Sequence, residues 1–305
     1  MTSTNPVLDS VLTYLSMRTG KQIRPLMVLL AARMCHGVCE KSIQTAVALE
    51  LLHTATLVHD DVVDSSDMRR SMPSVNAKFG NKAAVLTGDF LLAKTIELTA
   101  VLRNLHAFNI VAGIGQTLAS GELLQLHAGK SIWIDEARYN EIIRCKTAAL
   151  FAACMEAGAV SGGGTDRQTK ALGAFGMELG LAFQLKDDIL DYSDTDIGKP
   201  TLSDISDGKA TLPLIIALRR AHKAEAEKIK AMVEALDSPQ LTPGERDSAL
   251  QTILSFVIRY DGTGYAAKEM DRHKRKAVEH LALFHDSPAK SSLLQLLQYC
   301  IIRSY

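Results

Sequence analysis

Two stretches of this chain end in the same acidic pattern: LELLHTATLVHDDVVD at residues 49–64 and GMELGLAFQLKDDILD at residues 176–191. Each stretch is apolar at helical spacing and closes on three aspartates, which are Asp60, Asp61 and Asp64 in the first and Asp187, Asp188 and Asp191 in the second. Carboxylates one helical turn apart repel each other, and a carboxylate that is buried without a partner is costly. Two such clusters therefore predict a shared cationic partner, for which magnesium is well suited because it bridges carboxylates to substrate phosphates. The alternative is a pair of solvated acidic helix ends.

The composition describes an ordinary soluble globular protein and excludes several classes of function. Of the 305 residues, 47% are apolar and 22% are charged, and the 34 basic residues equal the 34 acidic ones. A chain with no net charge has no general attraction to nucleic acid or to an anionic membrane, so phosphate chemistry must come from local clusters. No apolar run is long enough for a membrane span, and the first 20 residues lack a signal-peptide pattern. The five cysteines, with no CxxC pair, indicate reduced core thiols in a cytoplasmic protein.

The residue pattern predicts an all-α fold. No proline lies between Pro73 and Pro200, and apolar residues in that interval recur at three and four positions. Asp135 is a good N-cap for a helix that runs to about Ala159. No alternating strand or hairpin signal stands out. The polar segment 237–247 is read as a loop, so residues 1–305 are expected to form a single helical domain.

Basic and polar residues accompany the first acidic motif. Lys21 and Arg24 lie in GKQIRP at residues 20–25, just before the helix that Pro25 is expected to open. Cations at a helix N-terminus can bind a diphosphate, although basic residues before helices are also common. His53 lies on the helix face that carries Asp60, where it is either a core residue or a phosphate ligand.

Further cations follow in the second half of the chain. Lys146 and Thr147 continue the apolar stripe of the helix from residue 136, where an unpaired ammonium would be expensive, so an anionic ligand is expected. The glycines at 176 and 180 would leave a groove for an apolar chain or allow close helix packing. The segment after Asp191 reads as a basic flap that closes over a metal–diphosphate site.

Together these motifs resemble the trans-isoprenyl diphosphate synthases, and among them the long-chain polyprenyl type that makes octaprenyl or solanesyl diphosphate. The resemblance runs from about residue 6 to the C-terminus and rests on GKQIRP, on the two aspartate motifs with the flanking arginines, on KT at 146–147 and on GKPTLSDISDGK at 198–209. It implies one large helical bundle around a central cavity, in an enzyme that is usually a homodimer. Such an enzyme condenses an allylic diphosphate (farnesyl or geranylgeranyl) with successive isopentenyl diphosphates, and its product supplies quinone side chains through a membrane enzyme. About three magnesium ions per site assist the departure of diphosphate.

The resemblance also implies roles for individual residues. Isopentenyl diphosphate would be bound by Lys21, Arg24, His53 and Arg70. The allylic diphosphate would be bound by Arg69, Lys146, Lys199 and Lys209. Catalytic positions would be Lys146, Thr147, Gln184, Lys199 and Lys209. Magnesium would be held directly by Asp60, Asp64 and Asp187, with support from Asp61, Asp188 and Asp191. Product length would be set by the small residues Ala55 and Thr56, although Ala55 could instead be small only to pack against another helix.

The chain departs from the family pattern at three positions in these motifs. Gln22 stands where a basic residue is usual, and Ser71 and Leu202 stand where glycines are usual. Competing readings are a short-chain farnesyl or geranylgeranyl diphosphate synthase and a non-catalytic subunit of a heteromeric synthase. A terpene cyclase or a head-to-head synthase of the squalene type fits less well, because a cyclase typically carries a different second motif and lacks the GKxxRP element. All six aspartates being present favours the active synthase.

Overall fold

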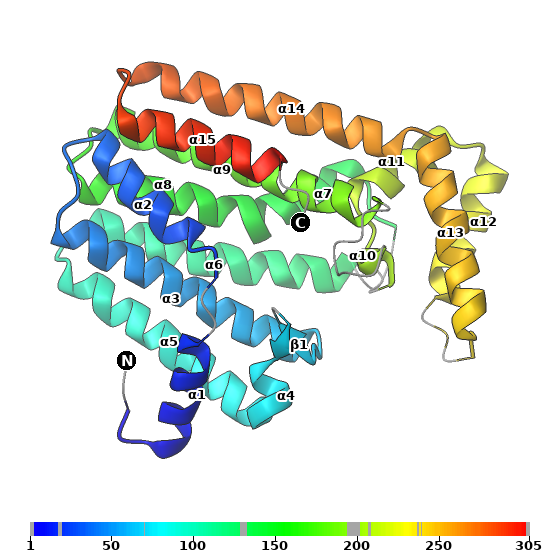
Figure 1. Ribbon diagram of the computed structural model, residues 1–305, viewed down its shortest axis with the longest axis horizontal. Helices are drawn as coiled ribbons and strands as arrows, with labels where there is room; N and C mark the ends of the chain where they lie inside the picture. Colours follow the sequence, from blue (N-terminus) through cyan, green and yellow to red (C-terminus); the bar gives the residue numbers. More distant parts are fainter. Residues whose placement is uncertain are drawn as a thin grey trace. The chain divides into compact units, whose positions relative to one another are not determined.

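The structure, a computed structural model, is all-α, which confirms the predicted fold class (Figure 1). It describes residues 3–17, 20–69, 71–128, 133–193, 202–206, 209–236, 238 and 240–302. Residues group into two compact units, of which unit 1 comprises Met1–Gln116, Ala153–Gly173 and Phe284–Lys290 and unit 2 comprises the rest. A single domain over residues 1–305 stays a prediction.

Unit 1 contains the first acidic motif. Its own elements are α1 (Pro6–Ser16), α2 (Ile23–Met34), α3 (Glu40–Val63), β1 (Met68–Arg69), β2 (Met72–Pro73), α4 (Val75–Phe79) and α5 (Asn81–Val101). Helix α3 packs along α2 and α5, and α4 packs on both α3 and α5 (Figure 1). One apolar cluster packs α4 against the C-terminal part of α3, and its buried residues are Val11, Val58, Val75 and Ala84. This packing fixes the segment that follows the first three aspartates.

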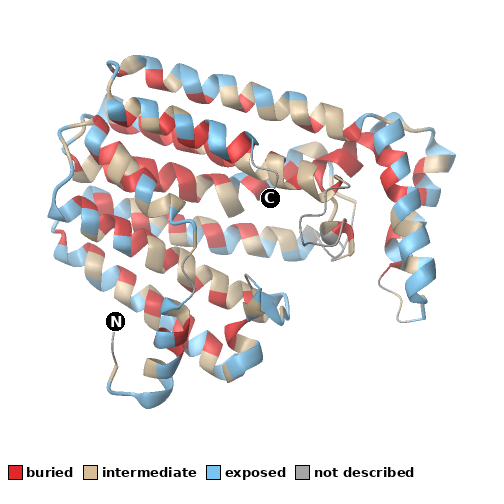
Figure 2. Ribbon diagram, in the orientation of Figure 1, coloured by how far each residue is buried: buried red, intermediate tan, exposed pale blue. Residues whose placement is uncertain are grey.

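Unit 2 contains the second acidic motif. Its own elements are α7 (Glu136–Ile143), a π-helical turn (Arg144–Ala148), α10 (Ser203–Ser206), α11 (Leu212–Arg220), α12 (Lys223–Ala235), α13 (Pro243–Arg259), α14 (Gly262–His280) and a 3-10 turn (Leu281–Leu283). Four helices contribute residues to both units: α6 (Leu105–Ala128), α8 (Ala149–Ser161), α9 (Asp166–Asp191) and α15 (Pro288–Ile302). Figure 2 shows that buried residues are concentrated along α8 and α9.

Several helix boundaries follow from capping residues. Asp135 caps α7 as predicted, because its carboxylate accepts a hydrogen bond from the Arg138 N–H at 2.8 Å. The loop assigned to 237–247 is shorter than predicted, since Thr242 and Glu245 form a capping box and α13 begins at Pro243. Helix α2 begins at Ile23 rather than at Pro25, so Arg24 lies within its first turn.

The expectation of no hairpin is wrong at one place. Strands β1 and β2 pair antiparallel, with Met68 opposite Pro73 and Arg69 opposite Met72. The left-handed residue of the turn is Ser71, with φ of 60°. The turn therefore forms without the Asn-Gly pair that usually marks a tight hairpin in a sequence. Such a short ladder cannot hold its own shape, and its side-chain contacts are described below.

Two further expectations concern the cysteines and the membrane. All five cysteines are free thiols; Cys154 and Cys300 are buried, whereas Cys39 is exposed rather than in the core. None of the helices in the described part of the chain combines the length and the apolar character that a bilayer crossing requires.

Candidate active site

The first acidic motif forms the last turn of α3 in unit 1, with Asp64 as its C-cap. Asp60 is half-buried and Asp64 is exposed, whereas Asp61 is only 2% exposed. The last turn carries no basic residue. Because the C-terminal end of a helix dipole is negative, each carboxylate there is unfavourable by about 0.3–1 kcal/mol. The accessible pair Asp60 and Asp64 is therefore poised to bind a cation.

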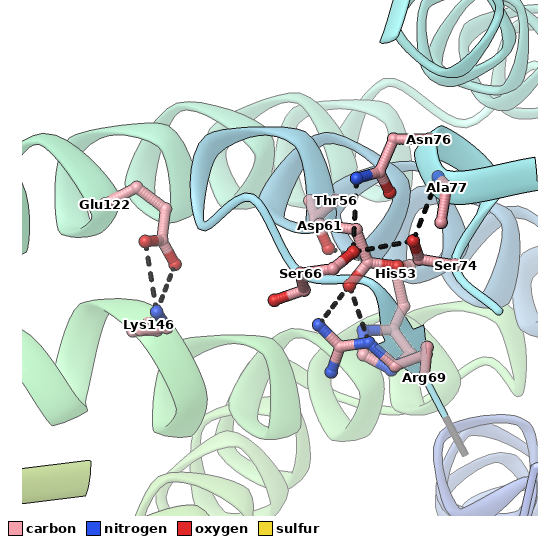
Figure 3. A network of polar contacts seen from close by, with 10 residues as sticks. All are labelled: His53, Thr56, Asp61, Ser66, Arg69, Ser74, Asn76, Ala77, Glu122 and Lys146. Carbon is pink, nitrogen blue, oxygen red and sulfur yellow. Dashed lines mark hydrogen bonds and ion pairs between the residues drawn. The ribbon is translucent and has the colours of Figure 1, made fainter. Parts of the chain in front are cut away.

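Asp61, unlike this pair, is buried, and it binds an arginine. Its Oδ1 accepts hydrogen bonds from Arg69 Nε at 2.8 Å and from Arg69 Nη2 at 2.5 Å (Figure 3). The arginine side chain remains about one-third exposed. Because the Asp61 carboxylate is buried and a buried carboxylate requires a donor, this two-fold contact fixes the position of Arg69.

The second acidic motif forms the last turn of α9 in unit 2, which again carries no basic residue. Asp187 and Asp191 are half-buried, and Asp188 is 1% exposed. Asp188 accepts a hydrogen bond from Tyr139 Oη on Oδ2 and one from Gln184 Nε2 on Oδ1 at 3.0 Å. Burial raises the pKa of the Asp188 carboxyl to about 7, against the lowering effect of these two donors.

Both motifs therefore share one arrangement, in which the outer aspartates are accessible and the middle one is buried against a protein donor. Within the described residues, no three His, Cys, Asp or Glu side chains converge into a cage that could hold a metal ion. Pairs of accessible carboxylates fit magnesium, which keeps waters and takes further ligands from substrate phosphates. The donor set thus fits a substrate-bridged magnesium ion rather than an all-protein site.

The predicted pair Lys146 and Thr147 occupies the π-helical turn between α7 and α8. π-Helical turns are rare in proteins, and those that do occur are often found at functional sites. Lys146 Nζ lies 2.8 Å from Glu122 Oε1 on α6 (Figure 3). It also lies 3.1 Å from Gln125 Oε1 on the same helix. The buried-face ammonium is thus neutralised by the protein's own carboxylate, which weakens the argument that it requires an anionic ligand.

Thr147 begins a chain of hydrogen bonds that ends at the second motif. Its hydroxyl donates to Gln184 Oε1 at 2.8 Å, and the Gln184 amide then donates to Asp188. This chain fixes the orientation of the Gln184 amide, because its oxygen accepts and its nitrogen donates. The predicted residues Thr147, Gln184 and Asp188 therefore form one connected network.

Two glycines let neighbouring helices reach the π-helical turn. A Cβ on Gly180 of α9 would lie 2.5 Å from Ala148 Cα, and a Cβ on Gly121 of α6 would lie 3.0 Å from Cys145 Cβ. Of the two explanations for the small residues on α9, close helix packing thus accounts for Gly180.

The segment after α9 is held to Asp191. The Leu202 N–H donates to the Asp191 carbonyl at 2.8 Å, and the Asp204 N–H donates to Asp191 Oδ2 at 3.2 Å. Leu202, at a usual glycine position, adopts φ of 62° although its side chain is only 1% exposed. Lys209 follows, with its N–H bonded to the Asp204 carbonyl at 2.8 Å. The proposed flap residue Lys199 lies outside the described residues.

The predicted isopentenyl diphosphate ligands lie in unit 1. Lys21 is exposed, and Arg24 is half-buried in the first turn of α2. His53, which Figure 3 shows on α3, is also half-buried. Gln22, which replaces a usual basic residue, is the N-cap of α2 with φ of 50°. Arg70 lies outside the described residues.

A comparison with known proteins identifies the family to which this chain belongs. The family model described as polyprenyl synthetase matches residues 5–243. The chain belongs to the polyprenyl synthetase family. Members of this family are divalent-metal-dependent enzymes that transfer prenyl groups.

Individual relatives agree with this assignment. The octaprenyl diphosphate synthase of Haemophilus influenzae is 37% identical over 302 residues, covering 98% of this chain and 89% of the relative. A solved decaprenyl diphosphate synthase from Rhodobacter capsulatus has a TM-score of 0.91 at 34% identity, covering 100% of this chain and 93% of that one. The polyprenyl synthase of Caulobacter crescentus, solved with calcium and isoprenyl diphosphate, has a TM-score of 0.89 at 35% identity, covering 100% and 92%. Short-chain isoprenyl diphosphate synthases are also among the relatives.

Several residues that contact the predicted site residues were not themselves predicted from the sequence. Glu122 and Gln125 share one face of α6 at a spacing of three, a signal that could have drawn attention to them. Tyr139 belongs to the apolar stripe of the helix from residue 136, and its hydroxyl contact with Asp188 has no local signature. Asp204 is close enough to raise the pKa of Asp188 by charge repulsion, although 13 residues separate it from Asp191.

The residues predicted to set product length differ in their surroundings. Ala55 is fully buried in a cluster with Leu12 and Leu91, which supports the packing explanation for its small size. Thr56 is half-buried, and its hydroxyl donates to the His53 carbonyl at 2.9 Å. Thr56 is therefore the better placed of the two to line a channel.

Proposed function

We propose that this chain is a magnesium-dependent, long-chain trans-polyprenyl diphosphate synthase. It condenses an allylic diphosphate, farnesyl or geranylgeranyl, with successive isopentenyl diphosphates. The observation that carries the proposal is the arrangement found in both motifs, with accessible outer aspartates at a helix C-terminus that has no basic residue. The long-chain names of the relatives described above support the product class.

In this proposal, Asp60, Asp64, Asp187 and Asp191 hold magnesium ions together with the allylic diphosphate. Bound magnesium neutralises the departing diphosphate and lowers the barrier to ionisation. Asp61 and Asp188 are supporting residues, since the first holds Arg69 and the second anchors Gln184. This division shifts Asp191 from the supporting role that the resemblance implied to a direct one, because it is half-buried like Asp187 rather than buried like Asp188.

The basic residues divide between the two diphosphates. Arg69, Lys146 and Lys209, together with Lys199, bind the allylic diphosphate, and each adds a charge-assisted hydrogen bond. The isopentenyl diphosphate is bound by Lys21, Arg24, His53 and Arg70. Lys146 would have to exchange its contact with Glu122 for the diphosphate.

The chemistry then proceeds by ionisation of the allylic substrate. The isopentenyl double bond attacks the allylic C1, the C–O bond to diphosphate breaks, and one proton is lost from the new product. The Thr147 and Gln184 side chains lie next to the second motif, where they can orient the reacting carbon. The released diphosphate is the proton acceptor, and exclusion of water protects the cation.

The chain is further proposed to be a homodimer. Helix α5 carries large apolar side chains that are exposed in the single chain, among them Leu86 at 67% and Ile96 at 58%. Exposed apolar residues clustered on one helix are typical of an interface. Sedimentation of the protein, with a Leu86→Glu variant expected to sediment as a smaller species, tests this part of the proposal.

The test of the catalytic proposal compares Asp60→Ala and Asp187→Ala with Asp166→Ala, an exposed carboxylate at the other end of α9. The first two should lose turnover by about three orders of magnitude or more, because each removes a ligand for transition-state charge. They should also lose the increase in melting temperature that magnesium and inorganic diphosphate give to the parent protein. The Asp166→Ala variant should retain both properties. Near-normal turnover of either motif variant would refute the proposal.

A further inference from the structure

The segment that carries Arg69 depends on contacts beyond its own short ladder. The chain leaves α3 through Ser65, which has a left-handed φ of 50°, and strands β1 and β2 precede α4. Because two-residue strands supply little stability of their own, the position of the Arg69 side chain must be set by other contacts.

One backbone carbonyl gathers these contacts. The Ser66 carbonyl accepts a hydrogen bond from Ser74 Oγ at 2.6 Å and a second from Asn76 Nδ2 at 3.1 Å (Figure 3). The Ser66 N–H donates to the Asp61 carbonyl at 2.9 Å, and the Ser74 N–H donates to the Asp67 carbonyl at 2.8 Å. The carbonyl that is clamped therefore lies between Asp61 and Arg69, the two members of the ion pair.

The two residues that donate to the Ser66 carbonyl are held in place by helix capping and by buried packing. Ser74 is fully buried and caps α4, because its hydroxyl accepts a hydrogen bond from the Ala77 N–H at 3.2 Å. The next residue, Val75, is fully buried in the cluster that also contains Val58 of α3. The clamp thus connects the base of α3 to the segment that bears Arg69.

Burial of the Asn76 amide carries a free-energy penalty. Its Oδ1 is buried and accepts no hydrogen bond from the described residues. A buried acceptor without a partner is unfavourable, and an apolar residue at the same place would avoid the penalty. The amide is therefore explained by what its nitrogen does, which is to hold the Ser66 carbonyl.

We propose that Ser74 and Asn76 are positioning residues for Arg69, and that through it they set the affinity for the allylic diphosphate. The inference rests on the proposed function, in which Arg69 binds that substrate. Neither residue touches substrate; both act by fixing the backbone between Asp61 and Arg69. Loss of the clamp should weaken allylic binding and leave binding of isopentenyl diphosphate nearly unchanged.

The experiment compares Asn76→Ala with Asn109→Ala, an exposed asparagine on α6. Asn76→Ala should raise the KM for the allylic diphosphate by about 2- to 10-fold, the range expected for one lost hydrogen bond. The KM for isopentenyl diphosphate should change by less than about twofold, and Asn109→Ala should change neither. Asn76→Asp, which keeps the shape but turns the donor into an acceptor, should have a larger effect in the same direction.

A double variant separates positioning from mere structural support. In an Arg69→Ala background, Asn76→Ala should add no further increase in the allylic KM, because the residue it positions is gone. Additive effects, or equal effects on both substrates with a lowered melting temperature, would overturn the proposal. If Arg69→Ala alone leaves the allylic KM unchanged, the assigned role of Arg69 fails instead. If Arg69→Ala raises it but Asn76→Ala and Asn76→Asp do not, only the positioning role fails.

Discussion

Leu202 offers a quantitative test of how the segment after the second motif is held. A left-handed conformation costs a non-glycine residue about 1–2 kcal/mol, whereas burial of a leucine side chain contributes about 1.5–3 kcal/mol. At 1% exposure, in a cluster with Tyr192 and Ile205, the burial of Leu202 outweighs the strain. The result is an anchor at a position where the family usually has glycine.

Two substitutions separate the two contributions. Leu202→Ala removes the packing, at about 2–5 kcal/mol, and keeps the strain. Leu202→Gly removes the same packing and releases the strain. The greater conformational entropy of glycine in the unfolded chain offsets about 0.5–1 kcal/mol of the stability gained by releasing the strain. The glycine variant should therefore be more stable than the alanine variant, by up to about 1.5 kcal/mol.

The assay is denaturant unfolding, with Leu214 as the matched control. Leu214 belongs to the same cluster and is fully buried, but it lies in helix α11 with ordinary helical geometry. There the order should reverse, because glycine is about 1 kcal/mol worse than alanine in a helix. An alanine variant at 202 that equals or exceeds the glycine variant would refute the assignment of a strained anchor. Both variants at 202 should also need more magnesium for half-maximal activity, since Asp191 loses its support.

Other predictions follow from single positions. Ser71→Gly should stabilise the protein by up to about 1 kcal/mol in denaturant unfolding, because Ser71 is exposed and gains nothing from burial to offset its left-handed φ of 60°; a less stable variant would contradict the hairpin geometry. Arg69→Ala should mainly raise the KM for the allylic diphosphate and Arg70→Ala that for isopentenyl diphosphate, each by about 10- to 150-fold, and equal effects on both substrates would count against this division. Thr56→Tyr should shorten the products to about C15–C20, on the reasoning that a side chain one turn, or about 5 Å, before Asp60 meets the growing chain early; unchanged product length, measured by chromatography, would exclude Thr56 from the channel.

The sequence was sufficient for the fold class and for the residues that carry charge. Helical periodicity and the scarcity of proline predicted an all-α chain, and Asp135 predicted the start of α7 correctly. These features are local, because capping and periodicity are properties of neighbouring residues. The repeated aspartate motif could likewise be recognised from the spacing of its residues alone.

What the sequence could not supply is the partner of each charged side chain. The pairing of Lys146 with Glu122 depends on how α6 packs on the π-helical turn, and no local signal predicts either. The burial of the middle aspartate in each motif likewise depends on tertiary contacts, with Arg69 in one case and with Tyr139 in the other. The left-handed conformations of Ser71 and Leu202 had one signal in the sequence, since glycine is usual at both positions, but neither residue type itself favours a positive φ.

The most direct test of the central claim is product analysis with the purified chain, farnesyl diphosphate and labelled isopentenyl diphosphate. Magnesium-dependent incorporation into products of about eight or more isoprene units is expected, with about three orders of magnitude less product from Asp60→Ala. Products that stop at C15–C20 would contradict the long-chain assignment, and no magnesium-dependent incorporation would contradict the synthase itself.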